Sequence, residues 1–170
     1  MTLPATDDVE QLLLRLLEAR VDFVVVGGIA AALHGSEQLT KDLDILVMFT
    51  VENMTHLMAA LRPLRPRNSA RPDLGEIQAD PAELARYRNL YLVTDLGRLD
   101  VLGELPPLGG YAEVAAAADR VELFGATCKV ISLDHLITVK EAVGRPKDLL
   151  VAAELRAIRD RLRNPPVPRT

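Results

Sequence analysis

Two aspartates, Asp42 and Asp44, are the residues whose type and spacing best suit metal chemistry. They lie in the segment DLDILV, where strict alternation predicts a β-strand with Leu43, Ile45 and Val47 on its buried face. The two carboxylates then share the outward face, about 6.5 Å apart, where they can bind a hard cation such as Mg²⁺ together with phosphate oxygens. The plainer alternative is the solvated face of an edge strand.

A glycine turn precedes these aspartates and favours the metal-binding alternative. Residues 24–26 are three valines and predict a buried strand, and residues 29–33 predict a short helix. Between them, Gly27 and Gly28 let the backbone turn tightly and approach a ligand without a Cβ in the way. Free N–H groups at the start of such a helix favour phosphate. The segment therefore predicts a site for a metal-bound triphosphate.

The order and spacing of these residues resemble the DNA polymerase β-like nucleotidyltransferase superfamily. The resemblance is strongest to its small bacterial branch, which includes abortive-infection toxins of toxin–antitoxin pairs. It is carried by Gly27-Gly28, His34-Gly35, Thr40 and Asp42-x-Asp44, and further along by Asp100, Lys140 and the run Arg145-Pro146-Lys147-Asp148. It covers roughly residues 9–160.

The resemblance implies a nucleotidyltransferase fold of the mixed α/β (α+β) class, with a mixed sheet flanked by helices and a C-terminal helical part. It implies three metal-binding and catalytic carboxylates, Asp42, Asp44 and Asp100, which would hold Mg²⁺ or Mn²⁺. It also implies four nucleotide-binding residues, Gly27, Gly28, Lys140 and Arg145. The implied reaction transfers a nucleoside monophosphate from an NTP to a hydroxyl of a tRNA end, a protein side chain or a small molecule. A toxin would also have an antitoxin protein as partner.

Several features keep other interpretations open. Gln38 stands where many members of this superfamily carry a basic residue, so the chain could be a catalytically idle module that binds nucleotide or a partner protein. Asp100 could be an ordinary outward-facing strand residue, with Asp95 the next choice for the third carboxylate. Arg145 could form a salt bridge at the start of a helix. Lys147 could likewise pair with Asp148.

Composition predicts one domain over residues 1–170, with a core at about 9–131 and C-terminal helices at about 132–163. With 170 residues, 49% of them hydrophobic, the chain can bury a single sizeable core. The formal net charge of −4 argues against binding nucleic acid by overall charge, although four arginines between residues 62 and 71 could form a local basic surface. The N-terminus lacks the features of a signal peptide and no segment resembles a membrane span, so we expect a cytoplasmic protein with no membrane partner.

Helical and strand periodicities place the remaining elements. An amphipathic helix is predicted over 7–20 with Thr6 as its cap, and another over 50–61, followed by a loop over 62–73. Hairpins are predicted from 89–94 with 98–102, and over 121–131 with a turn at Gly125. Ser132 is expected to cap a helix that runs through Ala142, and Pro146 to begin the last helix.

Overall fold

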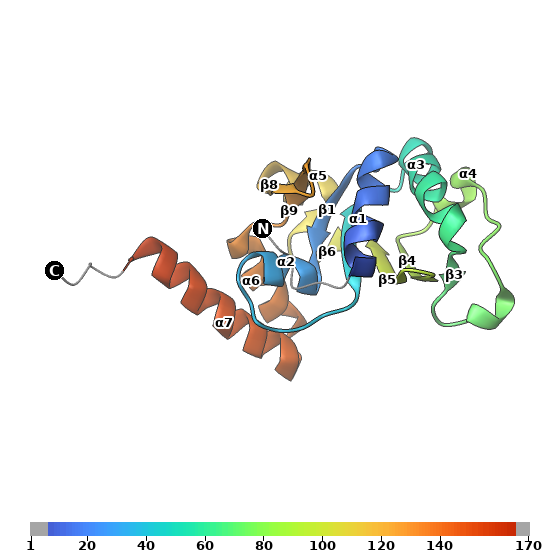
Figure 1. Ribbon diagram of the computed structural model, residues 1–170. Coiled ribbons are helices and arrows are strands. Elements are labelled where there is room, and N and C mark those ends of the chain that lie inside the picture. Colours follow the sequence, from blue (N-terminus) through green and yellow to red (C-terminus); the bar gives the residue numbers. More distant parts are fainter. Residues whose placement is uncertain (1–6, 166–170) are drawn as a thin grey trace.

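The chain is of the mixed α/β class, and its core is a mixed seven-stranded sheet with the order β3-β4-β5-β2-β1-β9-β8 (Figure 1). The computed structural model describes residues 7–165. The strands of this sheet are β1 (Phe23–Val26), β2 (Leu43–Val47), β3 (Arg67–Asn68), β4 (Asn89–Thr94), β5 (Gly97–Leu102), β8 (Asp119–Leu123) and β9 (Ala126–Val130). A separate hairpin-like pair consists of β6 (Glu104–Leu105) and β7 (Gly109–Gly110).

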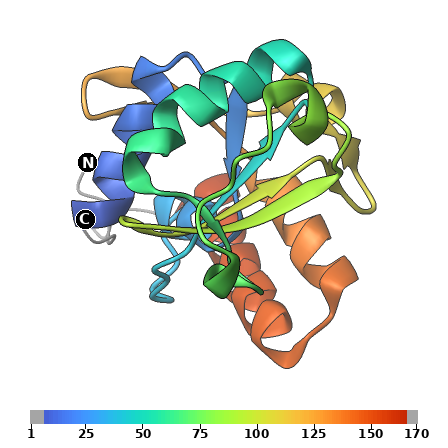
Figure 2. The ribbon, with the colours of Figure 1, turned by 90° about the vertical axis from the view of Figure 1, so that its right-hand side faces the viewer.

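The helices lie on both sides of the sheet. They are α1 (Asp7–Glu18), α2 (Gly27–Leu33), α3 (Val51–Leu61), α4 (Pro81–Leu84), α5 (Tyr111–Ala116), α6 (Leu133–Val143) and α7 (Pro146–Arg163). Helices α1 and α3 lie above the sheet and α6 and α7 below it (Figure 2). Helices α6 and α7 extend under only one half of the sheet, and among the described residues no α-helix lies beneath the half formed by β3, β4 and β5 (Figure 1).

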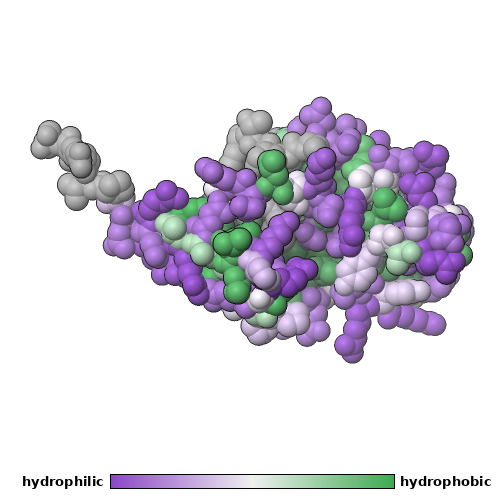
Figure 3. Space-filling view, turned by 90° about the horizontal axis from the view of Figure 1, so that it is seen from below, coloured by the Kyte–Doolittle hydropathy of each residue, from purple (hydrophilic) through white to green (hydrophobic). Residues whose placement is uncertain are grey.

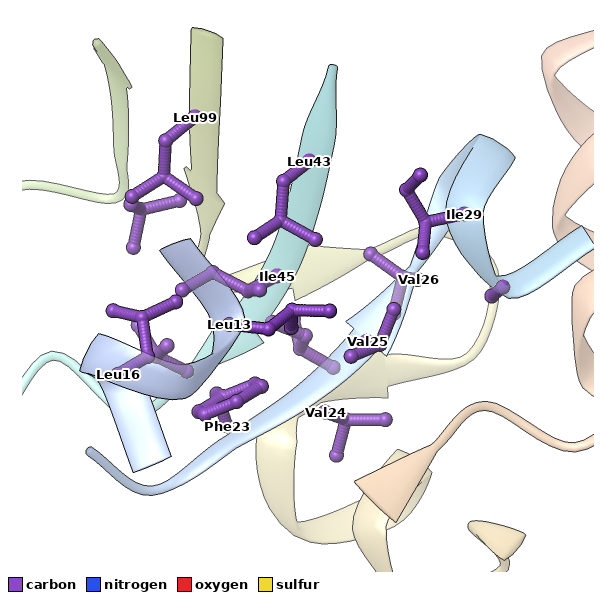
Figure 4. Packing of buried hydrophobic residues seen from close by; sticks show 14 of the residues in the cluster. Leu13, Leu16, Phe23, Val24, Val25, Val26, Ile29, Leu43, Ile45 and Leu99 are labelled. Carbon is purple, nitrogen blue, oxygen red and sulfur yellow. The ribbon is translucent and has the colours of Figure 1, made fainter. Parts of the chain in front are cut away.

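The core lies mainly between α1, α3 and the central strands. Leu13 and Leu16 of α1 pack over Phe23 and Val25 of β1 and over Ile45 of β2 (Figure 4). Burial of each such side chain contributes about 1.5–3 kcal/mol. This packing fixes the three strands that carry the candidate site.

The register of β2 decides which residues surround Asp44. Strand β2 runs parallel to β5 on one side and antiparallel to β1 on the other, so Asp44 pairs with Asp100 and with Val26. The edge-strand alternative is therefore wrong, because β2 is central. The expected outward acidic face is also only partly correct, since Leu46 on that face is fully buried, and Asp42 precedes the strand. A central strand covered by helices on both faces buries both sets of side chains.

Most predicted elements are present at the predicted positions. Both hairpins form, Ser132 caps α6 through a side-chain hydrogen bond, and Pro146 is the first residue of α7. Thr50, predicted as the first residue of its helix, is instead the residue that caps α3. The first helix ends at Glu18 instead of Arg20, which has a positive φ of 60°. The predicted Thr6 cap lies outside the described residues.

The differences fall in segments with weak periodicity. The predicted loop over 62–73 contains two short 3-10 turns, Arg62–Leu64 and Pro72–Leu74, and the edge strand β3, which pairs with β4. Helices α4 and α5 were not predicted, because each is six residues or shorter. No helix within residues 7–165 is long and apolar enough to cross a membrane.

Candidate active site

Asp42, Asp44 and Asp100 all line one cavity of about 490 Å³, which lies at the end of the central strands where β1 ends and β2 begins. Lys140 and Arg145, from α6 and the residue before α7, line the same cavity. Its walls thus carry both carboxylates and cationic side chains. The structure therefore brings together the three predicted carboxylates and the two predicted phosphate-binding cations.

Asp44 is the carboxylate at the centre of this cavity. Burial raises its pKa to about 6, and the neighbouring Asp100 carboxylate adds to the increase, whereas Lys140 acts to lower the pKa. Asp42 also acts to raise the pKa of Asp44, and a hydrogen bond from the backbone of Gly28 acts to lower it. Like charges close together disfavour ionisation of both, as does removal from water. The site therefore concentrates negative charge that a cation would relieve.

The two glycines have different roles next to Asp44. Gly27 has a positive φ of 65°, and a Cβ there would lie 2.2 Å from Oδ2 of Asp44, so only glycine fits. Gly28 has no positive φ, and a Cβ there would meet the side chain of Thr40 at 2.9 Å. Helix α2 begins at Gly27, two residues earlier than predicted. The close approach expected of the glycine turn is thus made to the Asp44 carboxylate.

Asp100 is held by an arginine that the sequence reasoning did not assign. Arg98 donates from Nε to Oδ1 at 2.9 Å and from Nη2 to Oδ2 at 3.3 Å. The Asp100 side chain is 16% exposed. Residues two apart on a strand share a face, so the RLD sequence already contained the signal for this pair.

Lys140 and Arg145 converge on Asp148, a second residue whose role the sequence reasoning missed. Lys140 Nζ lies 2.9 Å from Oδ1 and Arg145 Nε lies 2.6 Å from Oδ2. Burial acts to raise the pKa of Asp148, but the two hydrogen bonds outweigh it and hold the pKa below its usual value. The salt-bridge alternative for Arg145 is confirmed, whereas Lys147 has no ion pair with any described residue and its predicted pairing with Asp148 is wrong.

The segment between α2 and β2 forms another wall of the cavity. Gln38, Leu39 and Thr40 line it, and Leu39 is 81% exposed. Ser36 Oγ donates to Glu154 of α7 at 2.7 Å, which ties this segment to the C-terminal helix. His34, which follows the last residue of α2 as its C-cap, contacts the carbonyl oxygen of Ile131 through Nε2 at 2.7 Å, in keeping with a structural role at the helix end.

The donor chemistry of the cavity suits a hard cation. Its potential ligands are carboxylates, and no histidine or cysteine lines it. Within residues 7–165, however, no three His, Cys, Asp or Glu side chains lie close enough together to hold a metal ion as they stand. Asp100 is instead engaged by Arg98, so the three-carboxylate metal site remains a prediction.

Comparisons with known proteins add no assignment to this geometry. No protein-family model matches the chain, and a search of curated proteins finds no match either. The case for a function rests on the residues of the cavity and their arrangement.

Proposed function

We propose that this protein is a metal-dependent nucleotidyltransferase with a nucleotidyltransferase fold. The observation that carries the proposal is the pairing of Asp44 with Asp100 on adjacent parallel strands, at a cavity that also contains Asp42. Lys140 and Arg145 line the same cavity and match the charge of a triphosphate. This arrangement agrees with the resemblance drawn from the sequence.

The reaction moves a nucleoside monophosphate from an NTP to an acceptor. The acceptor hydroxyl oxygen forms a bond to the α-phosphorus, the bond from that phosphorus to the bridging oxygen breaks, pyrophosphate leaves, and the hydroxyl proton passes to water. Asp42, Asp44 and Asp100 would hold Mg²⁺ or Mn²⁺, which would supply charge neutralisation and lower the pKa of the attacking hydroxyl. Lys140 offers a point charge to the terminal phosphates.

Asp148 has a positioning role in this proposal. It is only 3% exposed and holds Lys140 and Arg145 at the cavity wall by hydrogen bonds. A buried carboxylate between two cations orients both and keeps them from pairing with Asp44 instead. The acceptor class remains a tRNA end, a protein side chain or a small molecule, and a role as the toxin of a pair with an antitoxin partner belongs to the same proposal.

The test is metal-dependent NTP binding by the parental chain and Asp44→Ala, measured by calorimetry. We expect the parent to bind NTP only with Mg²⁺ or Mn²⁺, and the variant to lose that binding, because the phosphate charge is no longer compensated. Asp160→Ala, an exposed acidic residue on α7, is the control for loss of one negative charge. Unchanged binding by Asp44→Ala would exclude the site.

A second candidate is a catalytically idle module that binds nucleotide or a partner protein. The engagement of Asp100 by Arg98, and of Lys140 and Arg145 by Asp148, favours it, because these pairs hold the reactive groups of the cavity. Transfer of label from each α-labelled NTP onto a cellular RNA and protein extract separates the two. Nucleotide binding without any labelled product would support the idle module.

A further inference from the structure

Two arginines lie on the lower face of the sheet in the half that, within the described residues, has no α-helix beneath it. Arg67 of β3 pairs with Val93 of β4, and Val93 pairs with Arg98 of β5. Residues directly opposite in neighbouring strands share a face, and Arg98 shares its face with Asp100, to which it is bonded. Arg67 and Arg98 therefore lie on the same face as the candidate active site. The view from below shows a mainly hydrophilic surface at this end (Figure 3).

The two arginines line a hollow of about 420 Å³ that adjoins the carboxylate cavity. Ser69 and Pro72 also line this hollow, and Arg98 lines both spaces. Both guanidinium groups retain unused donors. Arg98 uses Nε and Nη2 for Asp100, and its Nη1 has no partner among the described residues. Arg67 approaches only Asp95, at 3.7 Å, an acid that is already hydrogen-bonded by Arg65.

An exposed aromatic ring lies beside this hollow. Tyr91 of β4 is the register partner of Asp100, so its ring is on the same face, and the residue is 45% exposed. The backbone N–H of Ser69, which lines the hollow, donates to the backbone carbonyl of Tyr91 at 2.9 Å, so these two residues are neighbours on adjoining segments. Tyr91 thus lies one strand spacing, about 5 Å, from Asp100, and Arg98 lies two residues along the strand, about 7 Å, from Asp100, which makes Tyr91 and Arg98 diagonal neighbours.

We propose that Arg67, Arg98 and Tyr91 form a binding site for a nucleotide unit of the acceptor, with its phosphate on the two arginines and its base stacked on the tyrosine. This inference rests on the proposed function and specifies its acceptor. Guanidinium groups bind phosphate through paired N–H donors, and a flat ring stacks on any base. The site places the bound nucleotide next to Asp100, where its hydroxyl would attack.

The test uses the full chain and a short 5′-phosphorylated oligoadenylate carrying a fluorophore, with AMP and inorganic phosphate as competitors. We expect Arg67→Gln and Tyr91→Ala each to weaken binding of the oligonucleotide and of AMP by about tenfold or more. Arg120→Gln, an exposed arginine on β8 at the other edge of the sheet, is the control for charge and should change binding by less than about twofold. Thermal unfolding of each variant verifies the fold.

The outcomes separate this inference from the proposed function. Two results would overturn the nucleotide site. In the first, Arg120→Gln weakens oligonucleotide binding as much as Arg67→Gln does. In the second, inorganic phosphate competes as well as AMP, and its competition is unchanged by Tyr91→Ala. Absence of binding would do the same. Metal-dependent NTP binding should be unchanged in Arg67→Gln, so the acceptor site can fail while the NTP site stands. Much tighter binding of the oligonucleotide than of AMP would identify a nucleic acid end as the source, and equal binding a free nucleotide.

Discussion

Two charged clusters lie at opposite ends of β1, and the pKa of the central aspartate is shifted in opposite directions in the two. Before β1, Asp22 accepts hydrogen bonds from Tyr111 and from Lys129, the latter at 2.9 Å. Burial acts to raise the pKa of Asp22, but these bonds outweigh it and hold the pKa below its usual value. After β1, burial first and the nearby Asp100 and Asp42 carboxylates second raise the pKa of Asp44 to about 6.

The difference shows how a structural cluster can be distinguished from a functional one. The Asp22 cluster satisfies its own charges, and the tyrosine ring also lies 5.3 Å from the Lys129 ammonium. In the cavity cluster, Asp100 is paired with Arg98, but Asp44 has no ion pair with any described residue. A buried aspartate with a raised pKa costs the fold stability, and such a group at a cavity is typical of a site that binds a ligand.

The largest expected effect concerns Asp100 and would show that its role is chemical. Asp100→Asn keeps the size of the side chain and removes its charge, so Mg²⁺-dependent NTP binding should fall modestly while transfer to an acceptor falls by about a hundredfold or more. Rates with labelled NTP and affinities from calorimetry measure the two separately. Transfer at the parental rate would reduce Asp100 to an outward strand residue and leave Asp95 as the next choice.

The next effect concerns the contact between Gly27 and Asp44. Gly27→Ala adds both an unfavourable φ and a Cβ overlapping the carboxylate, and should destabilise the fold by about 3 kcal/mol. Gly125→Ala is the matched control, since Gly125 also has a positive φ, of 80°, but nothing lies within 4 Å of its Cβ position. The control should lose only about 1–2 kcal/mol in denaturant unfolding. Equal losses would mean that the Asp44 contact adds no strain.

The third effect is a gain in stability that depends on pH. The folded-state pKa of Asp44, about 6, exceeds its ordinary value of 3.8, so the folded state retains a proton that the unfolded state releases between these pH values. In metal-free protein, Asp44→Asn should therefore stabilise the fold at pH 8, by up to about 3 kcal/mol. The gain should vanish below pH 4. Denaturant unfolding at both pH values measures it, and a pH-independent difference would contradict the raised pKa of Asp44.

The smallest effect has the opposite sign and lies at the other cluster. Asp22 has a lowered pKa, so its charge stabilises the fold above the ordinary Asp pKa, and this contribution is lost as the pH falls through the lowered value. Asp22→Asn should destabilise the fold at pH 7 by less than about 1 kcal/mol, because the side chain is 52% exposed and screened by solvent. The same unfolding series should show the loss fading in acid. If Asp22→Asn stabilised the fold at pH 7, the two clusters would not differ in the way proposed.

The sequence by itself determined the local elements and the acidic strand. Period-two alternation and the cap at Ser132 depend on neighbours within a few residues, so they could be predicted from the sequence. The alternation of side chains along a strand also places Arg98 and Asp100 on one face, so their pairing could have been predicted in the same way. Short elements such as α4 and β3 have too few residues to show a period.

Only the tertiary structure decided which side chains meet. Asp44 lies beside Asp100 because β2 and β5, far apart in the chain, pair in parallel with a register that no local pattern specifies. Lys140 reaches Asp148 because α6 and α7 pack against each other. Side-chain charge is read from the sequence, but whether that charge is neutralised depends on partners brought near by folding. That is why Asp22 and Asp44, the same residue type in the sequence, have pKa values shifted in opposite directions.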